Sequence, residues 1–292
     1  MSRLYVVATP IGNLGDLSPR AEATLREADL ILAEDTRVTR RLLNAFNIKT
    51  PLESSHEHNE AAKAEEIVMR MRTNDITLAL VTDAGIPAVS DPGAAVVRAV
   101  SDAGFDVLTI PGPSAFVSAI SLSGFEDKEF TFFGFLPRKK GDLQRKLKSM
   151  AGRTGLAVFY ESPHRVPALL DAVCAVFPGI LVSVSRELSK LYEQTVRGSA
   201  EAVRARFKAD EGMLRGEFCL VLNLSGIKAD EKASGAGDTV EQRLFSFLAE
   251  GITLREASDA LILQGVRKNQ VYAASLLLKR VARSLLEQGT DG

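Results

Sequence analysis

The chain has 292 residues, of which 46% are hydrophobic and 25% are charged, and this composition excludes disordered and fibrous proteins. Its formal net charge is -1, so contact with nucleic acid would have to come from local basic patches rather than from the overall charge. Because no apolar run is long enough to span a bilayer and no secretion signal precedes Leu4, we expect a cytoplasmic protein with no membrane partner.

The first part of the chain, residues 1–112, alternates strand-like and helix-like segments. Short apolar runs rich in β-branched residues predict strands at Leu4–Thr9, Leu30–Asp35, Ile76–Val81 and Asp106–Ile110. Ser18 and Pro19 supply an N-cap and a proline at the first helical position for the helix after the first strand. Such alternation predicts an N-terminal α/β domain with a mostly parallel sheet covered by helices on both faces.

The second part, residues 113–226, has four more strand candidates, which are Phe130–Leu136, Leu156–Glu161, Ile180–Glu187 and Phe218–Leu224. A helix is expected at Pro163–Phe177, but other neighbouring strands have little helix between them. A second α/β domain with a mixed sheet follows from this pattern.

The last part of the chain differs in composition. Residues 227–240 are small, polar and glycine-rich, which is typical of a linker. Residues 241–292 are strongly helical with a break near Gly265, and Thr253 with Glu256 matches a capping box. We expect a small C-terminal helical appendage.

Glycine- and proline-rich loops follow three of the predicted parallel strands, at residues 9–17, 82–93 and 111–115. In parallel α/β sheets the ligand crevice lies at the carboxyl ends of the strands, so these loops favour a site for a cofactor-sized molecule. The first loop lacks the G-x-G-x-x-G pattern of dinucleotide sites, and the chain has no P-loop. The sequence therefore favours a cofactor other than NAD or ATP.

Seven motifs occur in a recognisable order: ATPIGNLGDL, AEDTR, HEHNE, TDAGIPAVSDPG, PGPSA, FYESPHR and RELSK. Together they resemble the tetrapyrrole-methylase-like superfamily of S-adenosylmethionine enzymes. Within it they are similar to the branch that methylates the ribose 2′-hydroxyl of a cytidine in small-subunit (16S) ribosomal RNA. The resemblance spans about residues 3–225. It implies two α/β domains with the cofactor S-adenosylmethionine in the cleft between them, a homodimer, and small-subunit ribosomal RNA as partner.

The resemblance also implies a set of cofactor-binding residues, position by position. They are Pro10, Asp83, Gly85, Ile86, Ser114, Ala115, Tyr160, Leu188 and Ser189. The chain has Thr82-Asp83-Ala84 where the superfamily has Gly-Asp-Pro, a departure that makes a porphyrin-like substrate less expected. The chemistry agrees, because a cationic sulfonium and ammonium suit an acceptor such as Asp83, and an adenine suits apolar walls.

Methyl transfer to a ribose hydroxyl benefits from a group that accepts the hydroxyl proton. Glu161, Glu187 and Lys190 are the catalytic candidates, since they end or follow strands of the second domain. Lys190 could accept a proton only if burial or a cationic neighbour lowered its pKa. The alternative is that Arg186, Glu187 and Lys190 form an ion-pair network that braces the cleft.

The HEHNE motif invites a metal site, but no further ligands with zinc-like spacing complete it, so no metal is predicted. His58 in this motif stays open as a general base.

Two basic segments are candidates for RNA binding. The first directly follows a predicted strand, and the second lies in the helical appendage; their cations are Arg138, Lys139, Lys140, Arg145, Lys146, Arg267 and Lys268. A solvated helix face is the alternative for the first segment, and docking of the appendage is the alternative for the second. Two other functions remain open, a small-molecule (tetrapyrrole-like) methylase and a non-catalytic RNA-binding factor.

Overall fold

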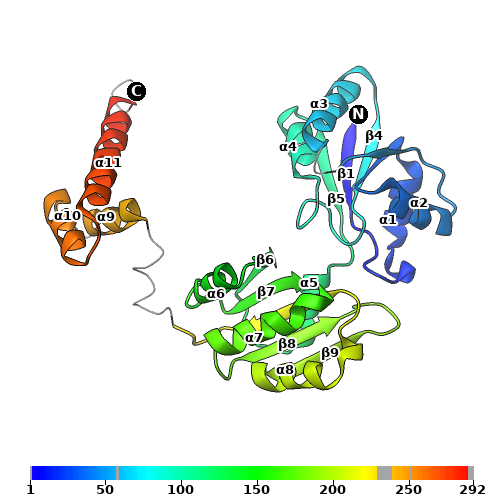
Figure 1. The fold of residues 1–292 in the computed structure, drawn as a ribbon. Helices are drawn as coiled ribbons and strands as arrows, with labels where there is room; N and C mark the ends of the chain where they lie inside the picture. Colours follow the sequence, from blue (N-terminus) through cyan, green and yellow to red (C-terminus); the bar gives the residue numbers. More distant parts are fainter. Residues whose placement is uncertain (1, 57–58, 229–238, 250, 289–292) are drawn as a thin grey trace. The chain divides into compact units, whose positions relative to one another are not determined.

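A computed structural model describes residues 2–56, 59–228, 239–249 and 251–288 (Figure 1). The chain forms two compact units, residues 1–226 and 227–292. The finer division into domains at residues 112 and 240 stays a prediction.

The first sheet of the larger unit has five strands in the order β3-β2-β4-β1-β5, and all of its neighbouring strands are parallel. Its strands are β1 (Arg3–Val7), β2 (Leu30–Ala33), β3 (Leu52–Ser54), β4 (Thr77–Val81) and β5 (Asp106–Ile110). The parallel sheet is confirmed. The three-residue edge strand β3 was not expected, because it is short and carries polar residues.

Helices cover both faces of this sheet, as the alternation predicts. On one face α1 (Pro19–Glu27) and α2 (Thr36–Ala45) pack Leu25 and Leu43 against the strands. On the other face α3 (Glu60–Thr73) and α4 (Ala94–Asp102) pack Ile67 and Val100. Ser18 caps α1 as expected, since its hydroxyl accepts the Ala21 N–H at 3.1 Å.

The second sheet of the larger unit is mixed, as predicted, with the order β6-β7-β10-β8-β9. Only β6 and β7 are parallel. The strands are β6 (Phe130–Phe135), β7 (Leu156–Glu161), β8 (Leu181–Arg186), β9 (Gln194–Ser199) and β10 (Phe218–Asn223). The sequence pattern did not indicate β9, which is an edge strand of largely polar residues.

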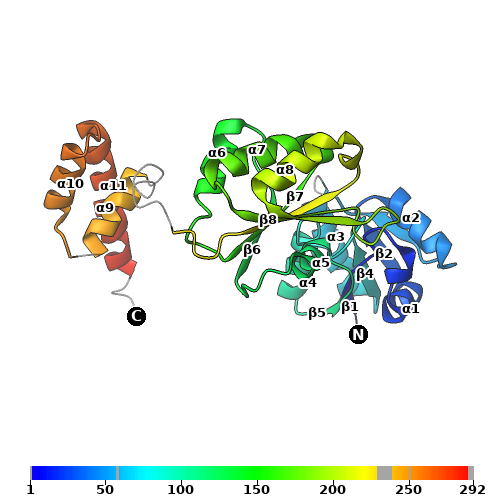
Figure 2. The ribbon, with the colours of Figure 1, turned by 90° about the horizontal axis from the view of Figure 1, so that it is seen from below.

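Helix α5 (Ala115–Ser123) lies on the opposite face of the second sheet from α6 (Lys140–Lys148), α7 (Val166–Val176) and α8 (Ala200–Ala209) (Figure 2). It packs Ala119 against Val158 and Val221. Helix α5 starts directly after the third glycine- and proline-rich loop, so the chain passes from the end of β5 onto the second sheet at this point.

The smaller unit is helical, with α9 (Val240–Ala249), α10 (Leu254–Leu263) and α11 (Lys268–Gln288). Leu244, Leu261 and Val271 are at the centre of its apolar core. The predicted capping box is confirmed, since the Thr253 side chain and the Glu256 carboxylate each bind the other's backbone N–H. No helix in the described part of the chain has the length and hydropathy to cross a membrane.

Candidate active site

The three glycine- and proline-rich loops meet at the carboxyl edge of the first sheet. The first and second loops pair through two hydrogen bonds, from the Thr9 N–H to the Gly85 carbonyl at 2.8 Å and from the Gly85 N–H to the Thr9 carbonyl at 3.1 Å. A methyl group on Gly112 in the third loop would lie only 2.9 Å from the Ala8 Cβ, so the third loop is pressed against the start of the first. The expected convergence of the loops is therefore confirmed.

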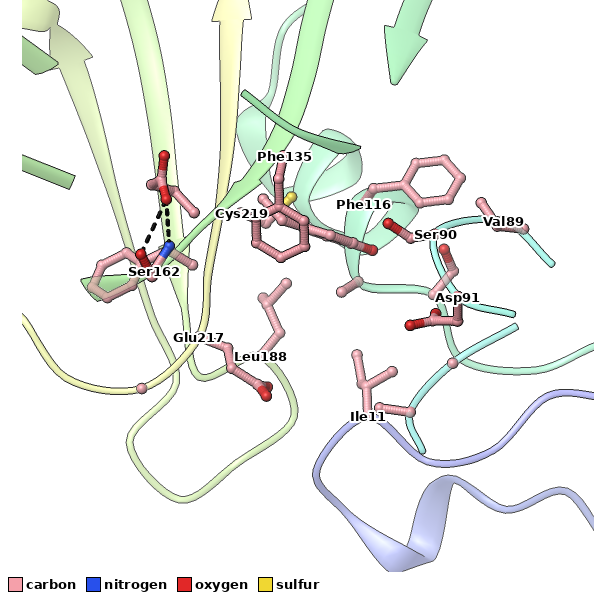
Figure 3. Close-up of a pocket in the computed structure, with 18 of the residues that line it drawn as sticks. Ile11, Val89, Ser90, Asp91, Phe116, Phe135, Ser162, Leu188, Glu217 and Cys219 are labelled. Carbon is pink, nitrogen blue, oxygen red and sulfur yellow. Dashed lines mark hydrogen bonds between the residues drawn. The ribbon is translucent and has the colours of Figure 1, made fainter. Parts of the chain in front are cut away.

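A cavity of about 360 Å³ lies where these loops face the second sheet (Figure 3). From the first three loops its lining includes Ile11, Gly85, Ile86, Asp91, Ser114 and Ala115. From the second sheet and the loops beside it come Phe135, Tyr160, Glu161, Leu188, Glu217 and Cys219. The lining is mostly apolar, with carboxylates at a few points, which is the usual character of a small-molecule site.

Six of the nine predicted cofactor residues line this cavity, namely Gly85, Ile86, Ser114, Ala115, Tyr160 and Leu188. Pro10, Asp83 and Ser189 are each next in sequence to a lining residue but are not part of the lining. The Asp83 carboxylate instead accepts the backbone N–H of Asp35 at 3.1 Å, which ties the second loop to the end of β2. Burial and the neighbouring carboxylates raise the pKa of Asp83.

Of the predicted catalytic residues, Glu161 lies in the cavity wall. It ends β7, and only 2% of it is exposed. Its Oε1 accepts the Ser162 N–H at 2.7 Å, and its Oε2 lies 3.2 Å from the Arg165 guanidinium without the geometry of a hydrogen bond. One oxygen of this carboxylate therefore retains capacity to accept a hydrogen bond.

Glu187 and Lys190 lie outside the lining and form an ion-pair network at its edge. The Lys190 Nζ donates to the Glu187 carboxylate at 3.0 Å and to the Glu217 carboxylate at 2.9 Å. Partial burial alone would lower the pKa of Lys190, but the hydrogen bonds that its ammonium donates to Glu217 and Glu187 outweigh burial and raise this pKa. Lys190 is thus a protonated donor at neutral pH, and the condition under which it could accept a proton is not met.

This network also contacts the first loop. A Cβ on Gly12 would overlap the aliphatic stem of Lys190, so only glycine leaves room for the lysine at that position. Glu187 and Ser189 both have positive φ, at 51° and 61°, which is uncommon for non-glycine residues. Strained backbone of this kind concentrates at functional sites. The loop after β8 is therefore held in a defined shape beside the cavity.

Asp91, Phe135 and Glu217 are among the lining residues that the sequence analysis did not name. Burial, with added repulsion from Glu34 and Asp83, raises the pKa of Asp91 from 3.8 to about 6. Figure 3 shows the carboxylates of Asp91 and Glu217 on different sides of the cavity. Asp91 was within reach of the sequence argument, because it belongs to the second loop.

None of the predicted RNA-binding residues belongs to the cavity lining. Arg138, Lys139 and Lys140 are exposed where β6 leads into α6, and no described residue forms an ion pair with them. Arg145 on α6 pairs with Asp142, and the Lys146 Nζ lies over an aromatic ring, 4.8 Å from the Phe133 centroid.

The second basic pair belongs to the smaller unit. Arg267, directly before α11, and Lys268, the first residue of α11, are both exposed. His58 lies outside the described residues. Within the described ranges, no three His, Cys, Asp or Glu side chains are grouped so that they could hold a metal ion.

Residues 3–204 match the family described as Tetrapyrrole (Corrin/Porphyrin) Methylases. The chain is 38% identical over 277 residues to ribosomal RNA small subunit methyltransferase I of Bacillus subtilis, a match that covers 94% of each chain. It is 41% identical over 271 residues to the protein of the same name from Halalkalibacterium halodurans, covering 92% of this chain and 93% of that one.

A solved structure of uroporphyrin-III C-methyltransferase from Thermus thermophilus, in complex with S-adenosyl homocysteine, has a TM-score of 0.51 to this chain. The two are 17% identical, and the alignment covers 76% of this chain and 97% of that one, so the likeness concerns the fold. The family match, by contrast, covers the whole first sheet, strands β6 to β9 of the second sheet and most of the loops around the cavity, and it ends before β10. The chain belongs to the tetrapyrrole methylase family.

Proposed function

We propose that the chain transfers a methyl group from S-adenosylmethionine to the ribose 2′-hydroxyl of a cytidine in small-subunit (16S) ribosomal RNA. The observation that carries this proposal is the cavity at the junction of three strand-end loops and the second sheet. Its lining is apolar apart from a few hydroxyl and carboxylate groups, and among the described residues that line it three are acids and none is Lys or Arg.

This lining fits the chemistry of S-adenosylmethionine. The molecule carries a cationic sulfonium and an ammonium group, which carboxylates such as Asp91 and Glu217 would stabilise. Its adenine suits apolar walls such as Ile86, Ala115 and Leu188. When bound, the cofactor supplies an activated methyl group on sulfur. A dinucleotide or nucleoside triphosphate fits poorly, because its phosphates would face the same carboxylates.

The remaining requirement is a hydroxyl held in line with the methyl group, and orientation of this kind contributes roughly 7–11 kcal/mol in favourable cases. Glu161 is the proposed proton acceptor, since it lines the cavity and its Oε2 has no hydrogen bond. Lys190 and Glu187 are proposed as positioning residues that hold the loop after β8 against Gly12 in the first loop. Pro10, Asp83 and Ser189 are proposed to hold the backbone of the lining residues that stand next to them in the sequence.

Ribosomal RNA as the substrate rests on two observations. The relatives at about 40% identity carry the name ribosomal RNA small subunit methyltransferase I. The exposed cations at Arg138, Lys139 and Lys140 follow directly after Phe135, which lines the cavity, so phosphates bound there would lie near the reacting groups. Arg145, Lys146, Arg267 and Lys268 are proposed as further RNA contacts. We also propose a cytoplasmic homodimer, which sedimentation of the full chain would test.

A methylation assay tests the proposal. Small ribosomal subunits from a strain that lacks this gene would be incubated with the protein and tritiated S-adenosylmethionine, and the labelled nucleoside would be mapped. We expect label on the ribose of a cytidine. Label on a base, or no label despite micromolar cofactor binding by calorimetry, would contradict the proposal.

The role of the basic segment needs its own variant. Replacing Arg138, Lys139 and Lys140 by Glu is expected to weaken subunit binding by at least about ten-fold at fixed salt, because three phosphate contacts are lost. Cofactor affinity should stay unchanged, since none of the three lines the cavity. Unchanged subunit affinity would remove this segment from the RNA-binding surface.

A further inference from the structure

The end of strand β6 is reshaped by one extra residue. Phe132 pairs with Val158 and Phe135 pairs with Tyr160, so three steps along β6 match two along β7. Gly134 inside this bulge has a φ of 62°, a left-handed conformation that glycine adopts without strain. Without the bulge Phe135 would share a face with Phe133. With it, Phe135 moves to the face of Phe132 and Tyr160.

That face is the cavity side of the sheet. Phe135 lines the cavity, and its ring meets the Tyr160 ring edge-on, with 5.9 Å between centroids. In Figure 3 it projects from the end of β6 toward the cavity. Yet 63% of Phe135 is exposed. A large aromatic ring has thus been turned toward a binding site and left with most of its surface uncovered.

The backbone that follows this ring is fixed. The Arg165 guanidinium donates to the carbonyls of Leu136 at 3.2 Å and Pro137 at 3.1 Å, and it forms the ion pair with Glu161. Leu136 itself is buried. The same arginine therefore ties the backbone after Phe135 to the carboxylate in the cavity wall.

An exposed aromatic ring between a cofactor cavity and a cationic segment is well placed to contact a base of an RNA substrate. Phosphates at Arg138 to Lys140 would bring the chain of nucleotides to the mouth of the cavity, but the 2′-hydroxyl of a helical nucleotide lies in the shallow minor groove of a duplex that is too wide to enter a cavity of about 360 Å³. An enzyme that acts on such a nucleotide takes its base out of the stack and compensates with stacking on aromatic side chains.

We propose that Phe135 is the stacking platform for the base of the methylated nucleotide and thereby sets the position of its ribose. This inference rests on the proposed function and deepens it by assigning a substrate contact to a residue that neither the sequence motifs nor the family resemblance assigned. Because any base has a flat apolar face, Phe135 would position the nucleotide without selecting its identity.

The test compares Phe135→Leu and Phe135→Tyr in the full chain, with small subunits from the gene-deleted strain and saturating S-adenosylmethionine. Loss of the ring is expected to lower kcat/KM for subunits by about 5- to 150-fold, the range that corresponds to one base stack. Tyrosine keeps the ring and should stay within about three-fold of wild type. Calorimetry should show the same cofactor affinity for all variants.

Phe130→Leu is the matched control. Phe130 starts the same strand and is 48% exposed, but it does not line the cavity, so its loss should leave kcat/KM within about three-fold of wild type. If Phe135→Leu lowers the melting temperature by more than about 4 °C, Phe135→Met is measured in its place.

Three results would overturn the proposal. Wild-type kcat/KM in Phe135→Leu would show that no base stacks there. If Phe135→Leu also lost cofactor affinity, Phe135 would be a contact of the cofactor rather than of the base. Wild-type protein that binds the cofactor but leaves subunits unlabelled would refute the proposed function itself, and the stacking role with it; that failure is recognised before any variant is compared.

Discussion

The carboxylate of Asp91 should stabilise the bound cofactor at the expense of the free protein. Asp91 is partly buried in the second loop, where burial, Glu34 and Asp83 raise its pKa from 3.8 to about 6. The folded protein thus binds the proton more tightly than the unfolded chain does. The carboxylate therefore destabilises the fold fully above pH 6, and this effect disappears as the pH falls from 6 through 3.8.

The size of the effect follows from the pKa. A rise from 3.8 to about 6 is equivalent to roughly 3 kcal/mol, but Asp91 is partly exposed, and solvent screening reduces the expected penalty to about 1 kcal/mol. Asp91→Asn should remove this penalty and raise the melting temperature of the larger unit by about 2–4 °C at pH 7.5. At pH 4 the variant and wild type should melt together.

The same substitution should weaken cofactor binding. A cation facing Asp91 across the cavity loses about 1–2 kcal/mol of attraction when the carboxylate becomes an amide, so the Kd for S-adenosylmethionine should rise about ten-fold. Scanning calorimetry and titration calorimetry at low salt would measure both effects. Asp102→Asn, at the exposed end of α4, is the control and should change neither.

Asp91→Asn is thus expected to raise the melting temperature and to weaken cofactor binding, and each of these two effects can be refuted by its own measurement. If Asp91→Asn lowers the melting temperature at pH 7.5, the carboxylate has a stabilising partner that the geometry does not show. If the variant binds the cofactor as tightly as wild type, Asp91 does not face the cationic groups.

Three further substitutions have definite expected outcomes. Glu161→Gln removes the ion pair with Arg165 and should cost about 2 kcal/mol of folding free energy, seen as a melting temperature lower by about 4–8 °C. An unchanged melting temperature would mean that the ion pair makes no net contribution to stability. Gly12→Ala places a methyl group on the stem of Lys190 and should weaken cofactor binding at least about three-fold in calorimetry with little loss of fold, whereas intact binding would show that the lysine moves freely. Thr253→Ala removes one half of the capping box and should destabilise the helical unit by about 1 kcal/mol in a helicity-monitored melt, without altering cofactor affinity.

The strands that the sequence identified are runs of mostly apolar residues, and they include the edge strands β5 and β6 as well as the central strands. The central strands β1 and β4 are runs of apolar residues because helices cover both sides of them, and such runs are visible in the sequence. The edge strands β3 and β9 were missed for the opposite reason. An edge strand has one neighbour and partial solvent contact, so it tolerates polar residues, and its identity depends on the partner strand rather than on its own pattern.

The residues of the candidate site also divide into those that the sequence could predict and those that it could not. The convergence of the three loops follows from parallel strand order, which the alternation of elements predicts, and the loop residues could be named on that basis. The contribution of Phe135 could not be predicted, because a single extra residue at Gly134 decides which face the ring takes. The raised pKa of Lys190 depends on Glu217, which lies 27 residues further along the chain.

The distribution of charge around the cavity gives the two substrates separate places. Inside, Asp91 and Glu217 attract a cationic cofactor and repel phosphate, so an RNA backbone is kept out of the position that the methyl donor needs. Outside, the cations at Arg138 to Lys140 favour phosphate and would repel the cofactor. A ribose is neutral, so neither the acidic cavity nor the cationic segment attracts it by charge. It is joined to the phosphate on one side and to the base on the other. In the proposed arrangement the phosphate would be held outside and the base would stack on Phe135, which would leave the 2′-hydroxyl to face the cavity. A ribose rather than a base atom is therefore the expected methyl acceptor.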